Sequence, residues 1–147
     1  MNGQDFLRVI RDAFVPFLTA LGFSMDEPSI SGRLYRASFS SASHTVSVSF
    51  EPGDNNFFLL IFTRENDVLS EMDNRSKTPR LSDLNSRYMQ SVNAAERVAN
   101  EAAFGSISIR DSDEAILLKS AKELRLVLPK YLDDQANSGS GLWSKRV

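Results

Sequence analysis

The side chain best suited to acid–base chemistry is His44, because it is the one histidine in the sequence and the only side chain expected to titrate near neutral pH. A catalytic histidine needs a carboxylate or a nucleophile within hydrogen-bonding reach. His44 instead stands where a short polar stretch meets an apolar strand pattern at Val46, Val48 and Phe50. We therefore expect a partly buried, structural histidine at a strand end.

Acidic side chains gather at Asp111, Asp113 and Glu114, a pattern that could serve a hard metal ion. The glycine and the later glutamate of a calcium loop are missing, and carboxylates just before a helical pattern cap its free backbone N–H groups. The sequence contains no cysteine, no glycine-rich phosphate loop and no GxSxG elbow. We expect no catalytic, cofactor or metal site, and hence a protein that is not an enzyme.

Length and composition match one globular domain: 147 residues, of which 41% are hydrophobic and 24% charged. A net charge of −2 provides no positive field for a polyanion, so we expect no nucleic-acid partner. No run of about 18 apolar residues occurs, which disfavours a membrane partner. The first residues lack the pattern of a secretory signal, so we expect a cytoplasmic protein.

The elements that must position functional side chains begin with an amphipathic helix over residues 5–21, in which Pro16 predicts a kink or a break near Val15. The hydrophobic period then changes to two, which indicates antiparallel strands. The third strand is apolar on both faces, which suggests that something packs against each side of it. The expected strands are residues 35–39, 43–50 and 57–64, with a weaker candidate at residues 23–25.

Two helices are expected in the C-terminal half of the chain. One follows Ser82 and Asp83 and runs to about Ala103, and the other begins near Ser112 and is interrupted near Pro129. We therefore predict a two-layer α+β domain over residues 1–134, in which an N-terminal helix precedes an antiparallel β-meander of three to five strands and two C-terminal helices. Residues 135–147, rich in serine and glycine, are expected to form a flexible tail.

Two candidate partner-binding surfaces follow from this pattern. The first is the polar face of the sheet, where Arg36 and Ser47 would lie beside an apolar set of the third strand that includes Phe58. Two possibilities stay open, because a C-terminal helix could cover those apolar side chains or the face could be a concave binding surface. The second surface is Leu126 on the last helix, with Lys119 and Lys122 on the same side.

The order of the segments SVSFEPGDNNFFLLIF, PRLSDLNSRYM and LLKSAKELRLVLPKYL resembles that of small uncharacterised bacterial α+β domains. Some of these are similar to immunity proteins of toxin systems, and the layout also resembles chaperones of secreted effectors. The resemblance implies a binding protein rather than an enzyme.

We therefore expect a non-enzymatic protein-binding module, with a protein as its partner. The alternative is a small-molecule or peptide-binding domain with a pocket between sheet and helices, indicated by ten phenylalanines and the doubly apolar third strand. Pairing of exposed strand edges into a homodimer is also possible for a small meander.

Overall fold

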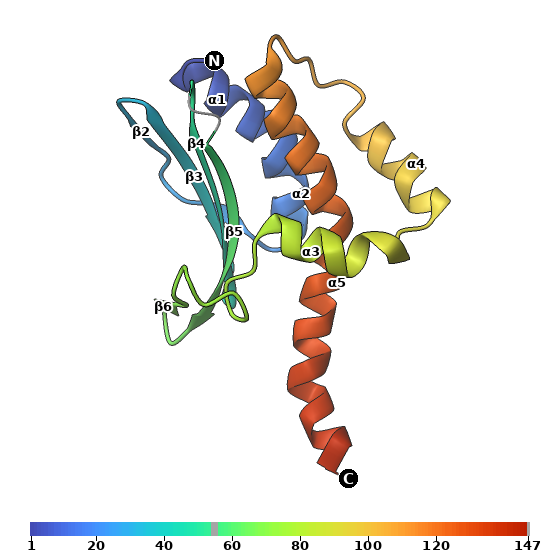
Figure 1. Cartoon of the computed structure of the whole chain (residues 1–147). Coiled ribbons are helices and arrows are strands. Elements are labelled where there is room, and N and C mark those ends of the chain that lie inside the picture. Colours follow the sequence, from blue (N-terminus) through green and yellow to red (C-terminus); the bar gives the residue numbers. More distant parts are fainter. Residues whose placement is uncertain (54–55, 147) are drawn as a thin grey trace.

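The computed structural model describes residues 1–53 and 56–146, with side chains described as far as residue 138. An antiparallel sheet lies beside a group of helices, and the N-terminal and C-terminal helices both lie on the same side of it (Figure 1). The expected α+β class, with a helix first and an antiparallel sheet after it, is confirmed.

The N-terminal helix consists of α1 (Gly3–Val9), a π-helical turn (Ile10–Phe14) and α2 (Val15–Ala20). Proline has no N–H, and its ring clashes with the carbonyl four residues earlier in a regular helix. The wider turn, in which the Val15 N–H donates to the Ile10 carbonyl, ends beside Pro16 and places it in the first turn of α2, where proline is tolerated. The expected interruption near Val15 is confirmed.

The sheet contains six strands, one more than the upper end of the expected range. Its order is β1-β3-β4-β5-β6, and β2 also pairs with β3. The extra strands are two or three residues long, too short to show a hydrophobic period. The strands are β1 (Ser24–Met25), β2 (Ser29–Ser31), β3 (Leu34–Ser40), β4 (His44–Glu51), β5 (Asn56–Glu65) and β6 (Val68–Leu69).

The hydrophobic core lies between one face of this sheet and the helices. Alternate residues of the three long strands point into it, as the period of two predicts. They pack with buried side chains of the N-terminal helix and of α5 (Ser112–Arg146). The sheet contributes Tyr35, Ala37, Phe39, Val46, Val48, Phe50, Leu59 and Ile61, and the helices contribute residues that include Phe6, Ile10, Phe14, Leu117, Leu124 and Leu128.

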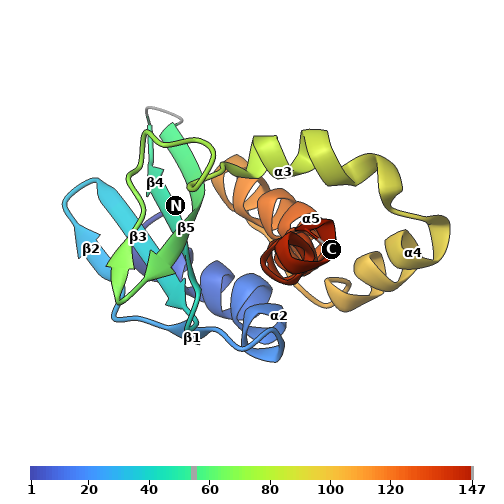
Figure 2. The same cartoon turned by 90° about the horizontal axis from the view of Figure 1, so that it is seen from below.

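The prediction of one continuous helix over residues 82–103 is wrong. The chain forms α3 (Leu81–Tyr88), a 3-10 turn (Met89–Ser91) and α4 (Ala94–Ala103). Asn93 starts α4, because its side chain accepts the Glu96 N–H at 2.8 Å while the Glu96 carboxylate accepts the Asn93 N–H at 3.1 Å. Figure 2, seen from below, shows α2, α3 and α4 around α5.

α5 continues without interruption through Pro129, contrary to expectation. Leu128 and Tyr131 are buried on either side of the proline, and their packing offsets the roughly 3 kcal/mol that an internal proline costs a helix. The expected tail, residues 135–147, is helical as far as Arg146. Whether it is flexible stays a prediction. In the described part of the chain, no helix has both the length and the apolar character needed to cross a bilayer.

An ion pair joins the N-terminal helix to the start of α5. The Arg8 guanidinium of α1 donates to the Glu114 carboxylate at the start of α5, and Glu114 has no exposed surface. The same carboxylate accepts the backbone N–H of Arg110 at 3.0 Å. The Asp111 side chain accepts the Glu114 N–H at 2.9 Å, which confirms its expected role as a helix cap.

We predict that Glu114→Ala lowers the free energy of unfolding by about 2–3 kcal/mol, because Nη2 of the half-buried Arg8 and the Arg110 backbone N–H both lose their acceptor. Asp12→Ala is the matched control, since Asp12 also pairs with Arg8, at 3.8 Å, but is 49% exposed. Its removal is expected to cost at most about 0.5 kcal/mol. Urea unfolding of both variants measures the difference, and equal losses would contradict this account of the ion pair.

Candidate functional site

The outer face of the sheet, opposite the core, forms a shallow hollow of about 500 Å³. Helices α1, α2 and α5 all lie on the other side of the sheet (Figures 1 and 2). We call this surface the open face. Its lining residues are Leu34, Arg36, Ser38, Thr45, Ser47, Ser49, Phe58, Leu60, Phe62, Leu69 and Met72.

The register of the strands arranges the open face in three rows. Each row crosses β3, β4 and β5, starts with a polar side chain and ends with an apolar one. Ser47 lies at the centre, in the middle row. The rows are Arg36–Ser49–Phe58, Ser38–Ser47–Leu60 and Ser40–Thr45–Phe62. Polarity therefore changes across the strands rather than along them, from β3 to β5.

Hydrogen bonds fix the polar side of the open face. Asp26, which follows β1, accepts hydrogen bonds from Ser38 at 3.0 Å and Ser40 at 2.8 Å. The Arg36 side chain donates to the Ser49 hydroxyl at 3.3 Å. Arg36 is the one charged side chain among the lining residues and is exposed. This side of the face offers hydroxyl groups and a guanidinium to a ligand.

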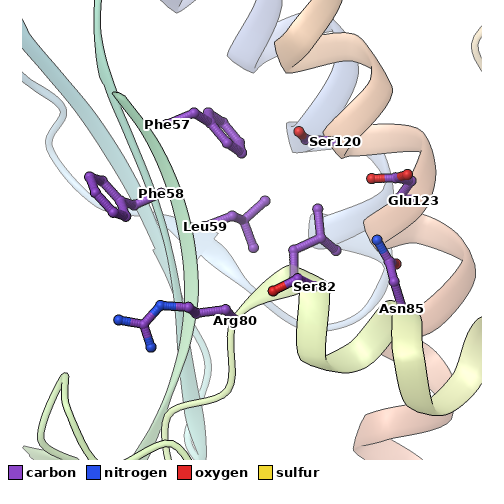
Figure 3. A pocket seen from close by; sticks show the side chains of 9 residues that line it. Phe57, Phe58, Leu59, Arg80, Ser82, Asn85, Ser120 and Glu123 are labelled. Carbon is purple, nitrogen blue, oxygen red and sulfur yellow. The ribbon is translucent and has the colours of Figure 1, made fainter. Parts of the chain in front are cut away.

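The apolar side of the open face is partly exposed to solvent. Phe58 points away from the helices, whereas Phe57 and Leu59 point towards them (Figure 3). Phe58 is 50% exposed, while Leu60 in the next row is 5% exposed. Of the two possibilities left open for the apolar set beside the polar face, cover by a C-terminal helix therefore does not hold for Phe58.

The segment after β5 completes the apolar side with Leu69 and Met72, both exposed. A tight turn at Asn66 and Asp67, both with positive φ, reverses the chain into β6. The buried Thr78 holds the returning segment, because its hydroxyl donates to the Glu71 carbonyl at 2.7 Å. Residues 65–79 are mostly polar and show no hydrophobic period, so the sequence does not predict that Leu69 and Met72 line the open face.

The structure brings together three of the six predicted binding residues. Arg36, Ser47 and Phe58 line the open face, whereas the other three lie on α5. Of these, Lys119 is exposed, Lys122 forms an ion pair with Glu101 of α4 at 3.0 Å, and Leu126 is half-buried against the core. α4 therefore occupies part of the second predicted surface, and the two surfaces do not form one site.

The open face presents groups that can form hydrogen bonds and apolar contacts with a ligand. Its lining residues combine hydroxyls, one guanidinium and apolar groups, and include no histidine and no carboxylate. Among the described residues of the whole chain, no group of three or more His, Cys, Asp or Glu side chains could hold a metal ion. Such a surface can accept and donate hydrogen bonds beside an apolar patch.

A second hollow, of about 620 Å³, lies between the end of α2, the β3–β4 turn and α5. His44 lines it and is 6% exposed, so that the expected burial at a strand end is confirmed. The imidazole Nδ1 lies 2.8 Å from the Ser43 hydroxyl, and the ring meets the Tyr131 ring edge-on at 5.7 Å. Nε2 has no hydrogen-bond partner among the described residues. Burial lowers the pKa of His44.

Comparison with known proteins adds no relative. No family model matches the chain, and neither a curated protein nor a solved structure is significantly similar to it.

We predict that His44 makes the folded protein sensitive to mild acid. Because the pKa of His44 in the folded state lies below the ordinary histidine value of 6.5, the unfolded chain binds the proton more readily. The free energy of unfolding should therefore fall as the pH drops below about 6.5. His44→Gln should flatten this dependence between pH 7 and 5.5, as measured by urea unfolding at several pH values. Equal slopes in both proteins would show that burial of His44 does not carry the effect.

Proposed function

We propose that this chain is a non-enzymatic protein-binding module, immunity-like or chaperone-like, which holds a segment of a partner protein on the open face. A two-layer arrangement with one uncovered sheet face is part of the proposal. So are a cytoplasmic location in a bacterial cell and the absence of nucleic-acid and membrane partners. The resemblance in segment order to small bacterial binding domains supports the proposal.

The observation that carries it is the half-exposed Phe58 at the end of a row of polar side chains. Exposed apolar patches rimmed by polar groups are typical of interaction sites. The same hollow is also lined by the exposed apolar side chains of Leu34, Leu69 and Met72. A half-exposed aromatic side chain in such a patch is the kind of residue that contributes strongly to binding energy at protein interfaces.

The rows also indicate the chemistry of the partner. A segment that binds the open face should place apolar side chains over β5 and the β6 segment. It should place hydrogen-bonding groups, or a carboxylate for Arg36, over β3. A surface with this polarity favours one orientation of the partner over the reverse.

The second candidate function is binding of a small molecule or peptide in the hollow beside His44. The unpartnered Nε2 of His44, in a hollow that Arg64 and Gln135 also line, favours it. Soaking crystals of the protein in a fragment library tests this alternative, and a hollow that stays free of fragments would count against it.

We predict that Ser47→Arg lowers capture of the partner at least about tenfold, because a long charged side chain would fill the centre of the open face. Ser106→Arg is the matched control, since Ser106 is exposed in the connection between α4 and α5. Phe58→Ala should lower capture to a smaller extent, about fivefold or more.

Immobilised proteins, a lysate of the native host and quantitative mass spectrometry measure this capture. The proposal fails if no protein is recovered, or if every recovered protein binds wild type and Ser47→Arg equally well.

A further inference from the structure

The outer edge of β5 carries backbone groups without a partner near its start. The Ile61 N–H points away from β4 and donates to the Pro79 carbonyl at 2.9 Å. Outward-pointing groups recur at every second residue of an antiparallel strand, so the N–H groups of Leu59 and Phe57 also point outward. In the described chain, the pairing along this edge ends at the bridge between Leu60 and Arg80.

The other long strand at a sheet edge is better covered. β2 pairs with the first half of β3, and β1 pairs with its last two residues. Proteins usually cover or interrupt free edges, because an unpaired edge is a template for another strand. Residues 56–59 are thus a stretch of a long strand whose outer edge stays open.

A hollow of about 260 Å³ follows this open edge. Phe57 and Leu59 on the helix side and Phe58 on the other side all line it, so it lies along the edge rather than on one face (Figure 3). On the helix side, Asn85 of α3 and Glu123 of α5 also line it, whereas the Arg80 side chain, which is paired with Leu60, extends to the Phe58 side (Figure 3).

Two buried polar atoms beside the edge have no partner. They are Nη1 of Arg80 and Oδ1 of Asn85, and neither makes a hydrogen bond within the described structure. A buried donor or acceptor without a partner destabilises the protein, and a ligand that supplies the missing group removes this cost. Arg80 needs an acceptor, for which a carboxylate is the strongest choice, and Asn85 needs a donor.

We propose that an extended segment of the partner protein adds to the sheet as a strand along residues 56–59, and that an acidic side chain of this segment pairs with Arg80. The inference rests on the proposed function, since Phe58 belongs both to the open face and to the edge hollow. A row of outward N–H and C=O groups is matched by a polypeptide backbone. The hollow beside it then receives side chains of the added strand.

A second copy of this chain is the other possible occupant of the edge. Its own open stretch, residues 56–59, has the sequence Asn-Phe-Phe-Leu and contains no acidic side chain. Pairing of two such edges would leave Arg80 without a carboxylate from the added strand. The unpartnered Nη1 of Arg80 therefore favours a different protein with an acidic segment.

The test starts with a phage-displayed library of random seven-residue peptides, selected on the immobilised full-length chain. Enriched peptides are expected to contain Asp or Glu among β-branched residues. For a synthetic copy of an enriched peptide, Arg80→Ala should weaken binding at least about tenfold, and Arg97→Ala, which removes an exposed arginine of α4, should not. Arg80→Gln and replacement of the peptide acid by its amide should weaken binding similarly.

Two N-methylated versions of the peptide test the strand geometry. Methyl groups on the backbone N–H groups that face β5 should abolish binding, while methyl groups on the alternate N–H groups should leave it within about twofold. Equal effects of the two methylation patterns overturn the proposal. So does a selection that enriches no peptide, and so does equal peptide binding by Arg80→Ala and Arg97→Ala. A dimer in sedimentation that the peptide dissociates also overturns it, because the occupant is then a second copy.

Ser47→Arg separates this proposal from the proposed function. If the peptide binds the edge but Ser47→Arg leaves capture of host proteins unchanged, the open face is not the binding surface and the edge proposal stands. If Ser47→Arg abolishes capture but no peptide depends on Arg80, the edge proposal fails and the proposed function stands.

Discussion

Burial of one face of the sheet against helices from opposite ends of the chain is the constraint on which the rest of the structure depends. β3, β4 and β5 direct alternate apolar side chains towards the N-terminal helix and α5. Helices α1, α2 and α5 all lie on that side of the sheet. No helix therefore covers the hydroxyl groups, Arg36 and Phe58 on the other face. The open face thus consists of the strand residues that alternate with the core residues and point to the opposite side of the sheet.

Much of the fold follows from local patterns in the sequence. The alternation in residues 43–50 predicted β4, and Pro16 predicted the break in the first helix. The split between α3 and α4 was missed, although Asn93 and Glu96 form a capping box, because an apolar stripe at helical spacing continues across it. Continuation of α5 through Pro129 depends on tertiary packing of Leu128 and Tyr131, which no local pattern shows.

The candidate site was predictable where it depends on strand alternation. Arg36, Ser47 and Phe58 fall on one face by their spacing and by the pairing of neighbouring strands. Leu69 and Met72 could not be predicted, since their position depends on the turn at Asn66 and on the contacts of Thr78. A helical projection placed Leu126 on the polar side of its helix, but it gave no information on the neighbouring α4.

The ion pair between Arg8 and Glu114 joins residues 106 positions apart in the sequence, so it can form only after the start of α5 has been synthesised. The sheet is complete after about residue 69, long before the residues of α5 leave the ribosome. Until then Leu59 and Ile61 lack the helix that packs beside them, and the nascent domain exposes part of its core. Contacts between distant parts of a chain slow folding and prolong such exposure. We therefore expect the nascent chain to be prone to aggregate in the interval before α5 emerges.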